Sequence, residues 1–284
     1  MVHNLTEPPL STTAKKLFGR STIYFDIASR ILPRLTTHRY QFLPNDAFFE
    51  WIERENVPIG KINYILVREL LDNAHLAATT ALARTILWSE AMCVSYEYSN
   101  FVAWASAARG LLESSGDIGD GLSNIAASLA KHHILLSAAL AGLQKKPLDL
   151  RPLEEPLSHF IRAKWTRDKS GETPRAKDNV EYVRWIGRAD IPGIVALYHK
   201  LCGITHPSSG SLDYMYTNDA DGLRLDINSG GHAIDEICAE FLDVFPASVM
   251  LSCNSTLLIL RVLHKFGRHP KLPEDSVLKF QQKP

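Results

Sequence analysis

The strongest constraint on the fold is a long helical period in residues 61–98. Apolar residues return there at steps of three and four, which is the repeat of one face of an α-helix. Ala, Leu, Arg and Glu, all good helix formers, dominate the stretch, and Pro58 and Gly60 precede it where a helix can begin. Among the apolar residues that recur in this way are Ile62, Ile65, Leu66, Leu70, Leu71 and Ala74. The segment therefore predicts a long helix.

The same period recurs on both sides of this segment. Strands do not alternate with helices, so a parallel α/β sheet is not expected. We expect Gly116 and Gly119 to close the helix that begins at Phe101, and Pro246 to break or kink the last one. Further helices are predicted over residues 12–32, 45–55, 101–115, 120–143, 152–165, 179–188, 191–205 and 232–266. The predicted fold class is mainly α, a helical bundle with a small β-hairpin or loop excursion near 208–231.

The excursion is predicted from a change of period. Apolar residues alternate on both sides of a turn sequence at 218–222, which is typical of a hairpin. The alternating residues are Leu212, Tyr214 and Tyr216, then Leu223, Leu225 and Ile227. Two domain divisions are open: an N-terminal helical segment 1–56 followed by a main bundle 57–284, or one continuous domain. Residues 166–179, which are polar, are the best candidate for a mobile loop or boundary.

Composition argues against several classes of protein. Hydrophobic residues make up 45% and charged residues 22%, which is typical of a globular chain and excludes disorder along its whole length. Lys plus Arg and Asp plus Glu both number 31, so nucleic acid or anionic lipid would need a local patch to bind. The four Cys form no CxxC pair and indicate free thiols in a reducing compartment.

No membrane association is expected, and the predicted location is the cytoplasm. Residues 1–10 lack the basic and apolar regions of a signal peptide. The apolar stretch 247–263 is interrupted by Ser, Asn, Thr and Arg, which indicates a buried amphipathic helix.

Common catalytic motifs are absent. The sequence contains no GxxxxGK[ST] phosphate loop, no GxGxxG after a strand, no HExxH and no GxSxG elbow. The acidic segment 219–231 only superficially resembles a calcium loop, because its Gly falls too early and the closing Glu is missing. No cofactor is therefore expected.

Two polar pairs on predicted helices could carry chemistry. Arg109 and Glu113 stand four residues apart among apolar neighbours, where they form either a fold-defining network or a ligand-binding pair. Arg68 and His75 lie two turns apart on one helix face. His is a capable general base near neutral pH, and Arg can stabilise charge on phosphorus. Such a pair, doubled by a dimer, could cleave RNA through its own 2′-hydroxyl; the alternative is that both are ordinary surface or core residues.

A third set of candidates lies near residue 200. His199, Cys202 and His206 share a helix face and could hold zinc with one open position. The paired ligand sequences of zinc sites are missing, however, so no metal site is assigned. The alternative places Cys202 in the core, His199 at the surface and His206 at a helix end before Pro207.

Charge is segregated late in the chain. Residues 162–188 carry eight Lys or Arg against four Asp or Glu, whereas residues 208–245 carry eight Asp or Glu against Arg224 alone. The two segments are either solvated surfaces or neighbours that attract one another; the other interpretation is a basic patch for RNA or DNA. In that interpretation the candidate contacts are Arg162, Lys164, Arg167, Arg175 and Lys177.

Two segments together resemble a known group of proteins. SAARGLLES at 106–114 and LYHKLCGITHPSSGS at 197–211 are similar to segments of bacterial all-helical proteins of unknown function, which are in turn similar to HEPN-like bundles. The matching positions are Arg109, Glu113, Tyr198, Cys202, His206 and Pro207. Many HEPN proteins are metal-independent endoribonucleases that act as dimers, and others only bind or scaffold. Their Arg-x4–6-His signature fits Arg68 and His75, and the resemblance assigns no role to Arg109 or His206.

Two functions follow as hypotheses. The first is an RNA-processing component of a bacterial defence or stress response, in which His206 or His75 is the general base and Arg109 or Arg68 binds phosphate. The second is a non-catalytic helical subunit that recognises a partner protein, with a buried Arg–Glu–His network. A metal-dependent hydrolase at His199, Cys202 and His206 is kept as a third reading. The expected partners are RNA or another protein, and a homo-oligomer is expected.

Overall fold

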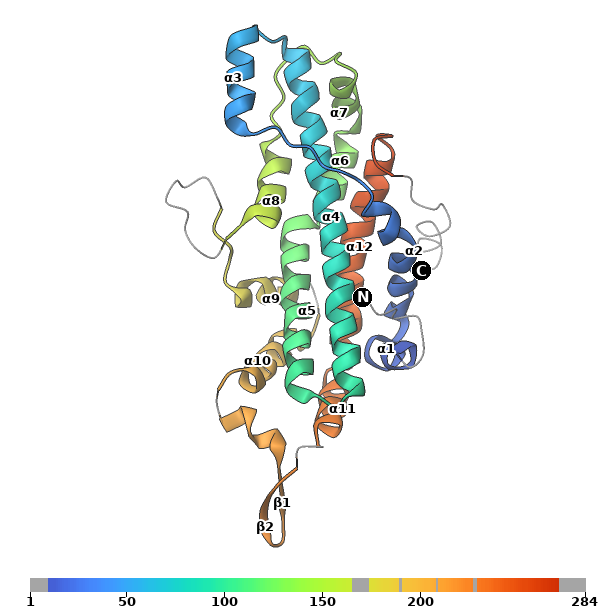
Figure 1. The fold of residues 1–284 in the computed structure, drawn as a ribbon, viewed down its shortest axis with the longest axis vertical. Helices are drawn as coiled ribbons and strands as arrows, with labels where there is room; N and C mark the ends of the chain where they lie inside the picture. The colour runs from blue at the N-terminus through green and yellow to red at the C-terminus, as the bar shows by residue number, and fades with distance from the viewer. Residues whose placement is uncertain (1–9, 165–173, 189–190, 208, 227–228, 271–284) are drawn as a thin grey trace. The chain divides into compact units, whose positions relative to one another are not determined.

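The computed structural model describes residues 10–164, 174–188, 191–207, 209–226 and 229–270. Within these ranges the chain is mainly α-helical, as predicted, with one short β-hairpin (Figure 1). The helices are α1 (Leu10–Phe18), α2 (Ile23–Leu35), α3 (Asn45–Glu55), α4 (Ile59–Glu97), α5 (Phe101–Leu122), α6 (Ile125–Lys131), α7 (His133–Leu140), α8 (Arg151–Arg162), α9 (Asn179–Arg188), α10 (Ile194–Thr205), α11 (Gly230–Glu240) and α12 (Val244–His264). The fold class predicted from the sequence is confirmed.

The hairpin pairs β1 (Tyr216–Asp219) with β2 (Gly222–Leu225) in antiparallel register, with Tyr216 opposite Leu225. Gly222 closes the turn with φ +120, a conformation that side-chain-bearing residues rarely adopt. The predicted first strand starts at Leu212, whereas the observed strand β1 starts at Tyr216. Residues 209–211 and 213–215 form 3₁₀ turns instead. Ile227, the last residue of the predicted second strand, lies outside the described residues.

Three predicted helices are interrupted. A 3₁₀ turn at Gly19–Thr22, which begins with Gly19 at φ +53, divides the helix expected over 12–32. The helix expected over 120–143 is divided into the end of α5, then α6 and α7. The last helix breaks between α11 and α12, upstream of Pro246. Pro246 lies in the first turn of α12, where a missing N–H removes no helical hydrogen bond.

The described contacts divide the chain into two compact units, each assembled from three segments. Unit 1 contains residues 1–30, 81–120 and 177–254, and unit 2 contains residues 31–80, 121–176 and 255–284. Helices α2, α4, α5 and α12 contribute residues to both units. The domain division expected at residue 56 stays a prediction.

Unit 1 packs around α5. The buried Trp104 ring meets Phe245 edge to face, with centroids 5.6 Å apart. Ser252 Oγ of α12 donates to Ser115 Oγ of α5 at 3.0 Å. These small side chains let the two helices approach closely. A Cβ at Gly116 would overlap the Tyr182 backbone of α9, and one at Gly119 would overlap the Trp185 ring. The two glycines predicted to end α5 are therefore packing positions inside it, and the helix continues to Leu122.

Unit 2 is organised by the first half of α4. A Cβ at Gly60 would lie 2.9 Å from the Gly142 carbonyl oxygen, so only glycine fits at this close approach. Buried Asn63 donates to the carbonyls of Gln144 (3.1 Å) and Lys146 (2.9 Å), and accepts from the Leu148 N–H at 3.3 Å. The Asn63 side chain thus hydrogen-bonds the backbone of the segment that connects α7 and α8. The polar groups of this segment have no partners within a helix.

Helix α12 is long and apolar enough to cross a membrane by length and composition. Half of its most apolar window is buried inside the protein, and core helices of globular proteins pass the same test.

Candidate functional site

The first candidate site lies in unit 1, where α5 meets the end of α10. Arg109 Nε donates to Glu113 Oε1 at 2.8 Å, and the Tyr198 hydroxyl donates to the same oxygen at 2.9 Å. Arg109 Nη1 lies 3.3 Å from Thr205 Oγ1 and also 3.3 Å from His206 Nε2. These five residues form one polar set, the Arg109 network, from two distant segments of the sequence.

Local sequence explains how each helix presents its part of the network. The four-residue spacing of Arg109 and Glu113 places them one turn apart on the same face of α5. Pro207 disfavours helical conformation in the residue before it, and His206 is accordingly extended, at φ −92 and ψ 149. α10 therefore ends at Thr205, and His206 lies exposed just beyond it.

The network is charged but internally compensated. The side chains of Arg109 and Glu113 are 23% and 22% exposed. Burial lowers the pKa of Arg109, but the hydrogen bond and charge of Glu113 outweigh it, so the pKa lies above its usual value. Burial and the neighbouring Glu113 carboxylate also raise the pKa of the Tyr198 hydroxyl. At neutral pH the network therefore contains an ion pair and a tyrosine hydroxyl that keeps its proton.

The Arg109–His206 contact assigns a role to one imidazole nitrogen. A guanidinium can only donate hydrogen bonds, so His206 Nε2 accepts from Arg109 Nη1 in this contact. Arg109 Nη2 makes no hydrogen bond to a residue that the structure describes. A proton acceptor and a cationic donor thus lie side by side at an exposed edge, an arrangement suited to an anionic group.

The other predicted pair is not brought together. Arg68 Nη2 approaches Glu69 Oε1 at 3.5 Å, whereas His75 Nδ1 lies 2.7 Å from the Tyr40 hydroxyl. His75 is 1% exposed, and burial lowers its pKa to about 3. So buried and so weak a base is poorly suited to general base catalysis near neutral pH. The geometry favours Arg109 and His206 over Arg68 and His75.

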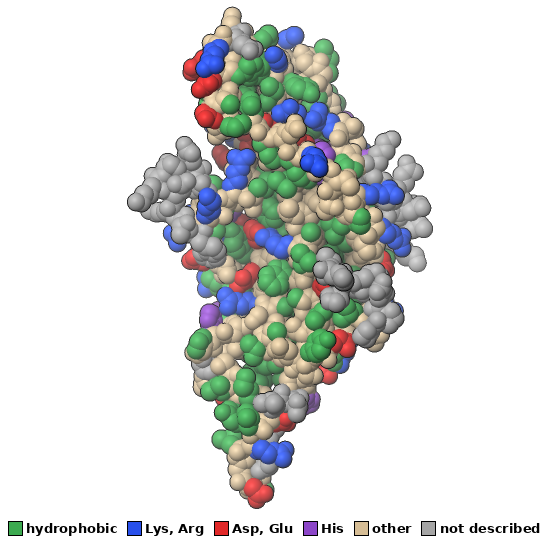
Figure 2. Space-filling model, viewed as in Figure 1, with side chains coloured by type: hydrophobic (Ala, Val, Ile, Leu, Met, Phe, Trp, Pro, Cys, Tyr) green, Lys and Arg blue, Asp and Glu red, His purple; other side chains and the backbone are tan. Residues whose placement is uncertain are grey.

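The predicted basic contacts have separate surroundings. Lys177 in unit 1 pairs with Asp120 at 2.5 Å. In unit 2, Lys164 and Arg175 form a backbone bridge, and exposed Arg162 lines a cavity. Arg167 lies outside the described residues. Figure 2 shows Lys and Arg side chains dispersed over the face drawn, among Asp and Glu.

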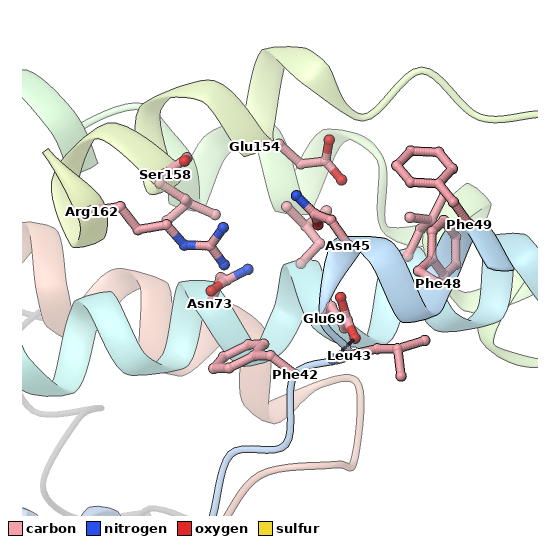
Figure 3. A pocket seen from close by; sticks show the side chains of 13 residues that line it. Phe42, Leu43, Asn45, Phe48, Phe49, Glu69, Asn73, Glu154, Ser158 and Arg162 are labelled. Carbon is pink, nitrogen blue, oxygen red and sulfur yellow. Dashed lines mark hydrogen bonds between the residues drawn. The ribbon is translucent and has the colours of Figure 1, made fainter. Parts of the chain in front are cut away.

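The cavity in unit 2 has a volume of about 320 Å³ and opens between α3, α4 and α8. Figure 3 shows Glu69 and Asn73 on α4 facing Glu154 and Arg162 on α8. Burial raises the pKa of Glu154, and repulsion from Asp149 and Glu69 raises it further. The remaining lining residues are Phe42, Leu43, Asn45, Phe48, Phe49, Leu66, Leu70, Leu157 and Ser158. The cavity thus combines aromatic walls with two carboxylates and one guanidinium.

The sequence reasoning missed a cluster of histidines around Asp72 in unit 2. His269 Nε2 lies 3.0 Å from Asp72 Oδ1, and His38 Nε2 lies 3.6 Å from the same oxygen. The His75 ring stacks on His269, with centroids 4.4 Å apart and planes 7° from parallel. The only sequence signal is the high count of 11 His, since His38 and His269 stand in connecting segments without periodicity.

Burial controls protonation in this cluster. It lowers the pKa of His38, and the neighbouring His269 lowers it further. Burial alone would raise the pKa of Asp72, but the hydrogen bond and charge of His269, together with the charges of Arg268 and His38, outweigh it and leave the pKa below its usual value. The cluster therefore places an ionised carboxylate beside two imidazoles, those of His38 and His75, whose pKa values are lowered.

The zinc set considered near residue 200 does not gather in the same way. Among the described residues, the group whose ligand atoms all lie within 4.8 Å of one another is His38, Asp72 and His269. His199 is exposed, and His206 Nε2 already faces Arg109.

No family model, curated protein or solved structure matches the chain.

Proposed function

We propose that the Arg109 network binds the phosphodiester of RNA and that the protein is a metal-independent ribonuclease of the cytoplasm. The supporting observation is the 3.3 Å approach of Arg109 Nη1 to His206 Nε2 at the exposed edge of the network. The resemblance to HEPN-like bundles adds a role in a bacterial defence or stress response and action as a homodimer.

The proposed reaction needs only these side chains and water. When Arg109 Nη1 turns from His206 Nε2 to the phosphate, His206 Nε2 takes the proton of a ribose 2′-hydroxyl, and the 2′-oxygen forms a bond to the adjacent phosphorus. The bond from phosphorus to the 5′-oxygen breaks, which leaves a 2′,3′-cyclic phosphate and a 5′-hydroxyl that takes a proton from water. Arg109 stabilises the charge on the phosphorane, and Glu113 holds the guanidinium in place.

A second function is favoured by a different observation in the same network. Glu113 Oε1 accepts from both Arg109 and Tyr198, and Tyr198 is 5% exposed. With its charge compensated, Arg109 serves mainly to hold α5 against α10. In that case the protein is a non-catalytic helical subunit that recognises a partner protein.

The test is cleavage of defined RNA by purified full-length protein in EDTA. The wild type is compared with His206→Ala and Arg109→Ala, and with His199→Ala as the matched control, since His199 is an exposed histidine on α10, the helix that ends just before His206. We expect a loss of about 10²–10⁴-fold in cleavage rate for His206→Ala. His199→Ala should cleave as the wild type does.

The products and the stabilities separate the two functions. Products ending in 2′,3′-cyclic phosphate, lost only in the network variants, support the ribonuclease. No cleavage by the wild type, together with a large loss of stability in Arg109→Ala, supports the non-catalytic subunit instead. Equal cleavage by the wild type and a folded His206→Ala variant contradicts the proposed base.

A further inference from the structure

The histidine cluster of unit 2 has the geometry of a metal site. In a tetrahedral site with bonds of about 2.0–2.1 Å to nitrogen and oxygen, neighbouring ligand atoms lie about 3.3–3.4 Å apart. The His269 and His38 Nε2 atoms lie 3.0 and 3.6 Å from Asp72 Oδ1, on either side of that spacing. The ligand atoms of the three residues all lie within 4.8 Å of one another.

Unpartnered buried nitrogens point to a ligand. His38 Nε2, His269 Nδ1 and His75 Nε2 are buried and have no hydrogen-bond partner among the described residues. His75 and His269 are 1% and 7% exposed. A buried polar atom without a partner costs about 1–3 kcal/mol, and His38 Nε2 is such an atom within the proposed ligand set. A cation seated against Asp72 Oδ1 would give His38 Nε2 the partner that it lacks.

The donor set selects the kind of ion. Two imidazoles and one carboxylate suit zinc and its neighbours in the first transition row, whereas Ca²⁺ and Mg²⁺ prefer oxygen ligands alone. Three protein ligands leave a fourth position for water.

The residues around the cluster resemble the support that metal-binding histidines receive. The parallel ring of His75 packs against His269, and His75 Nδ1 is held at 2.7 Å by the Tyr40 hydroxyl. The His75 ring limits rotation of the His269 ring, and the Tyr40 hydroxyl holds His75 in turn. Tyr40 and His75 are therefore positioning residues.

We infer that His38, Asp72 and His269 bind one divalent transition-metal ion of the zinc class. The ion joins the segment that follows α2 and the segment that follows α12 to α4, all within unit 2. It is independent of the RNA reaction proposed for unit 1.

The experiment begins with full-length protein stripped by a chelator and titrated with Zn²⁺, with Mg²⁺ and Ca²⁺ as comparison ions. We expect one zinc per chain after gel filtration, a rise in melting temperature with free zinc, and a visible Co²⁺ spectrum of low coordination number. Asp72→Asn, which keeps the side-chain shape, and His269→Ala should lose the zinc. His132→Ala removes an exposed histidine of the same unit and should keep it.

Several outcomes would overturn the inference. Wild-type protein that binds no zinc has no such site. Zinc retained by both Asp72→Asn and His269→Ala, or lost in a His206→Ala variant instead, places the ion elsewhere. If His269→Ala fails to fold by circular dichroism, the Asp72→Asn stoichiometry and its Co²⁺ spectrum decide.

Discussion

Glu113 holds the Arg109 network together, because its Oε1 accepts hydrogen bonds from both Arg109 and Tyr198. Tyr198→Phe removes one hydrogen bond and should lower the free energy of unfolding by about 0.5–1.5 kcal/mol. Glu113→Ala leaves the Arg109 guanidinium half-buried without its anion, and should cost about 1–3 kcal/mol. Urea unfolding measures both. His199→Ala, on the exposed side of α10, should change stability by less than about 0.5 kcal/mol; a larger effect would show that loss of any α10 side chain is costly.

The cysteines give a second test at the scale of single residues. Burial raises the pKa of the Cys93 and Cys238 thiols to about 12, and raises that of the fully buried Cys253 as well. Because the thiolate is the reactive form, these three should resist a thiol reagent at pH 8 in the native protein and react once it is unfolded. Peptide mass spectrometry after brief labelling identifies the modified cysteines. Rapid native labelling of Cys93 or Cys253 would contradict the packing of unit 1.

Tyr40 tests whether the histidine cluster is positioned for a metal. Tyr40→Phe removes the hydroxyl that holds His75 Nδ1 and leaves the three proposed ligands in place. The loss of a residue that hydrogen-bonds a ligand directly typically weakens metal affinity by about 10–100-fold. Because the Tyr40 hydroxyl acts through His75, we expect an effect at the lower end of that range. We expect weaker Zn²⁺ binding by competition with a chelating dye, an altered Co²⁺ spectrum and unchanged stoichiometry. Unchanged affinity and spectrum would show that Tyr40 has no positioning role.

At the scale of helices, one glycine of α5 and one of α10 should have opposite effects on stability when changed to alanine. Gly116→Ala would force a methyl group into the Tyr182 backbone and should cost about 1–3 kcal/mol. Gly203→Ala in α10 meets nothing within 4 Å and should stabilise the protein by about 0.5–1 kcal/mol. Thermal unfolding of the two variants checks the sign. Gly116→Ala as stable as the wild type would mean that α9 does not pack against α5 as described.

Helices whose ends are set by local chemistry could be predicted from the sequence. The bounds of α3 and α9 agree with the periodicity, and Pro207 marks the end of α10. Helix ends set by packing could not be predicted in this way. Gly116 resembles a terminator in sequence but lies where α9 needs room, and the break between α6 and α7 at His132 has neither Gly nor Pro. Tertiary contacts decide such positions, and periodicity does not contain them.

The candidate sites also differ in how much of each could be predicted from the sequence. Arg109 and Glu113 are one turn apart, so their pairing follows from spacing alone. Their contacts with Tyr198 and His206 depend on how α10 packs on α5, for which only the resemblance gave a signal. His38 and His269 come from connecting segments at distant points of the chain. No local rule relates such segments, and the cluster became visible only in the structure.

At the scale of the whole molecule, the two proposed sites use residues of different units. The Arg109 network belongs entirely to unit 1, and the histidine cluster entirely to unit 2. With a net formal charge of zero, the protein as a whole has no net electrostatic attraction for RNA, so the proposed RNA binding would depend on local contacts such as those of Arg109. Each proposed function should therefore be removable without the other.

This separation gives the last prediction. Chelation should remove the unit 2 ion and lower the melting temperature, because a ligand that binds the folded state stabilises it. RNA cleavage should continue, since the mechanism proposed for His206 and Arg109 uses no metal. His206→Ala should abolish cleavage and keep one zinc per chain. Measuring zinc content, melting temperature and RNA products on the same samples tests both halves.

A different set of results would place the reaction in unit 2. If chelation stops cleavage, Zn²⁺ restores it and a folded His206→Ala variant still cleaves, the chemistry belongs to His38, Asp72 and His269. A three-ligand zinc site with an open position can activate water for phosphodiester hydrolysis. Such cleavage would leave a phosphate monoester rather than a 2′,3′-cyclic phosphate, because water rather than the 2′-hydroxyl attacks phosphorus. The chemistry of the RNA ends therefore identifies the unit in which the reaction occurs.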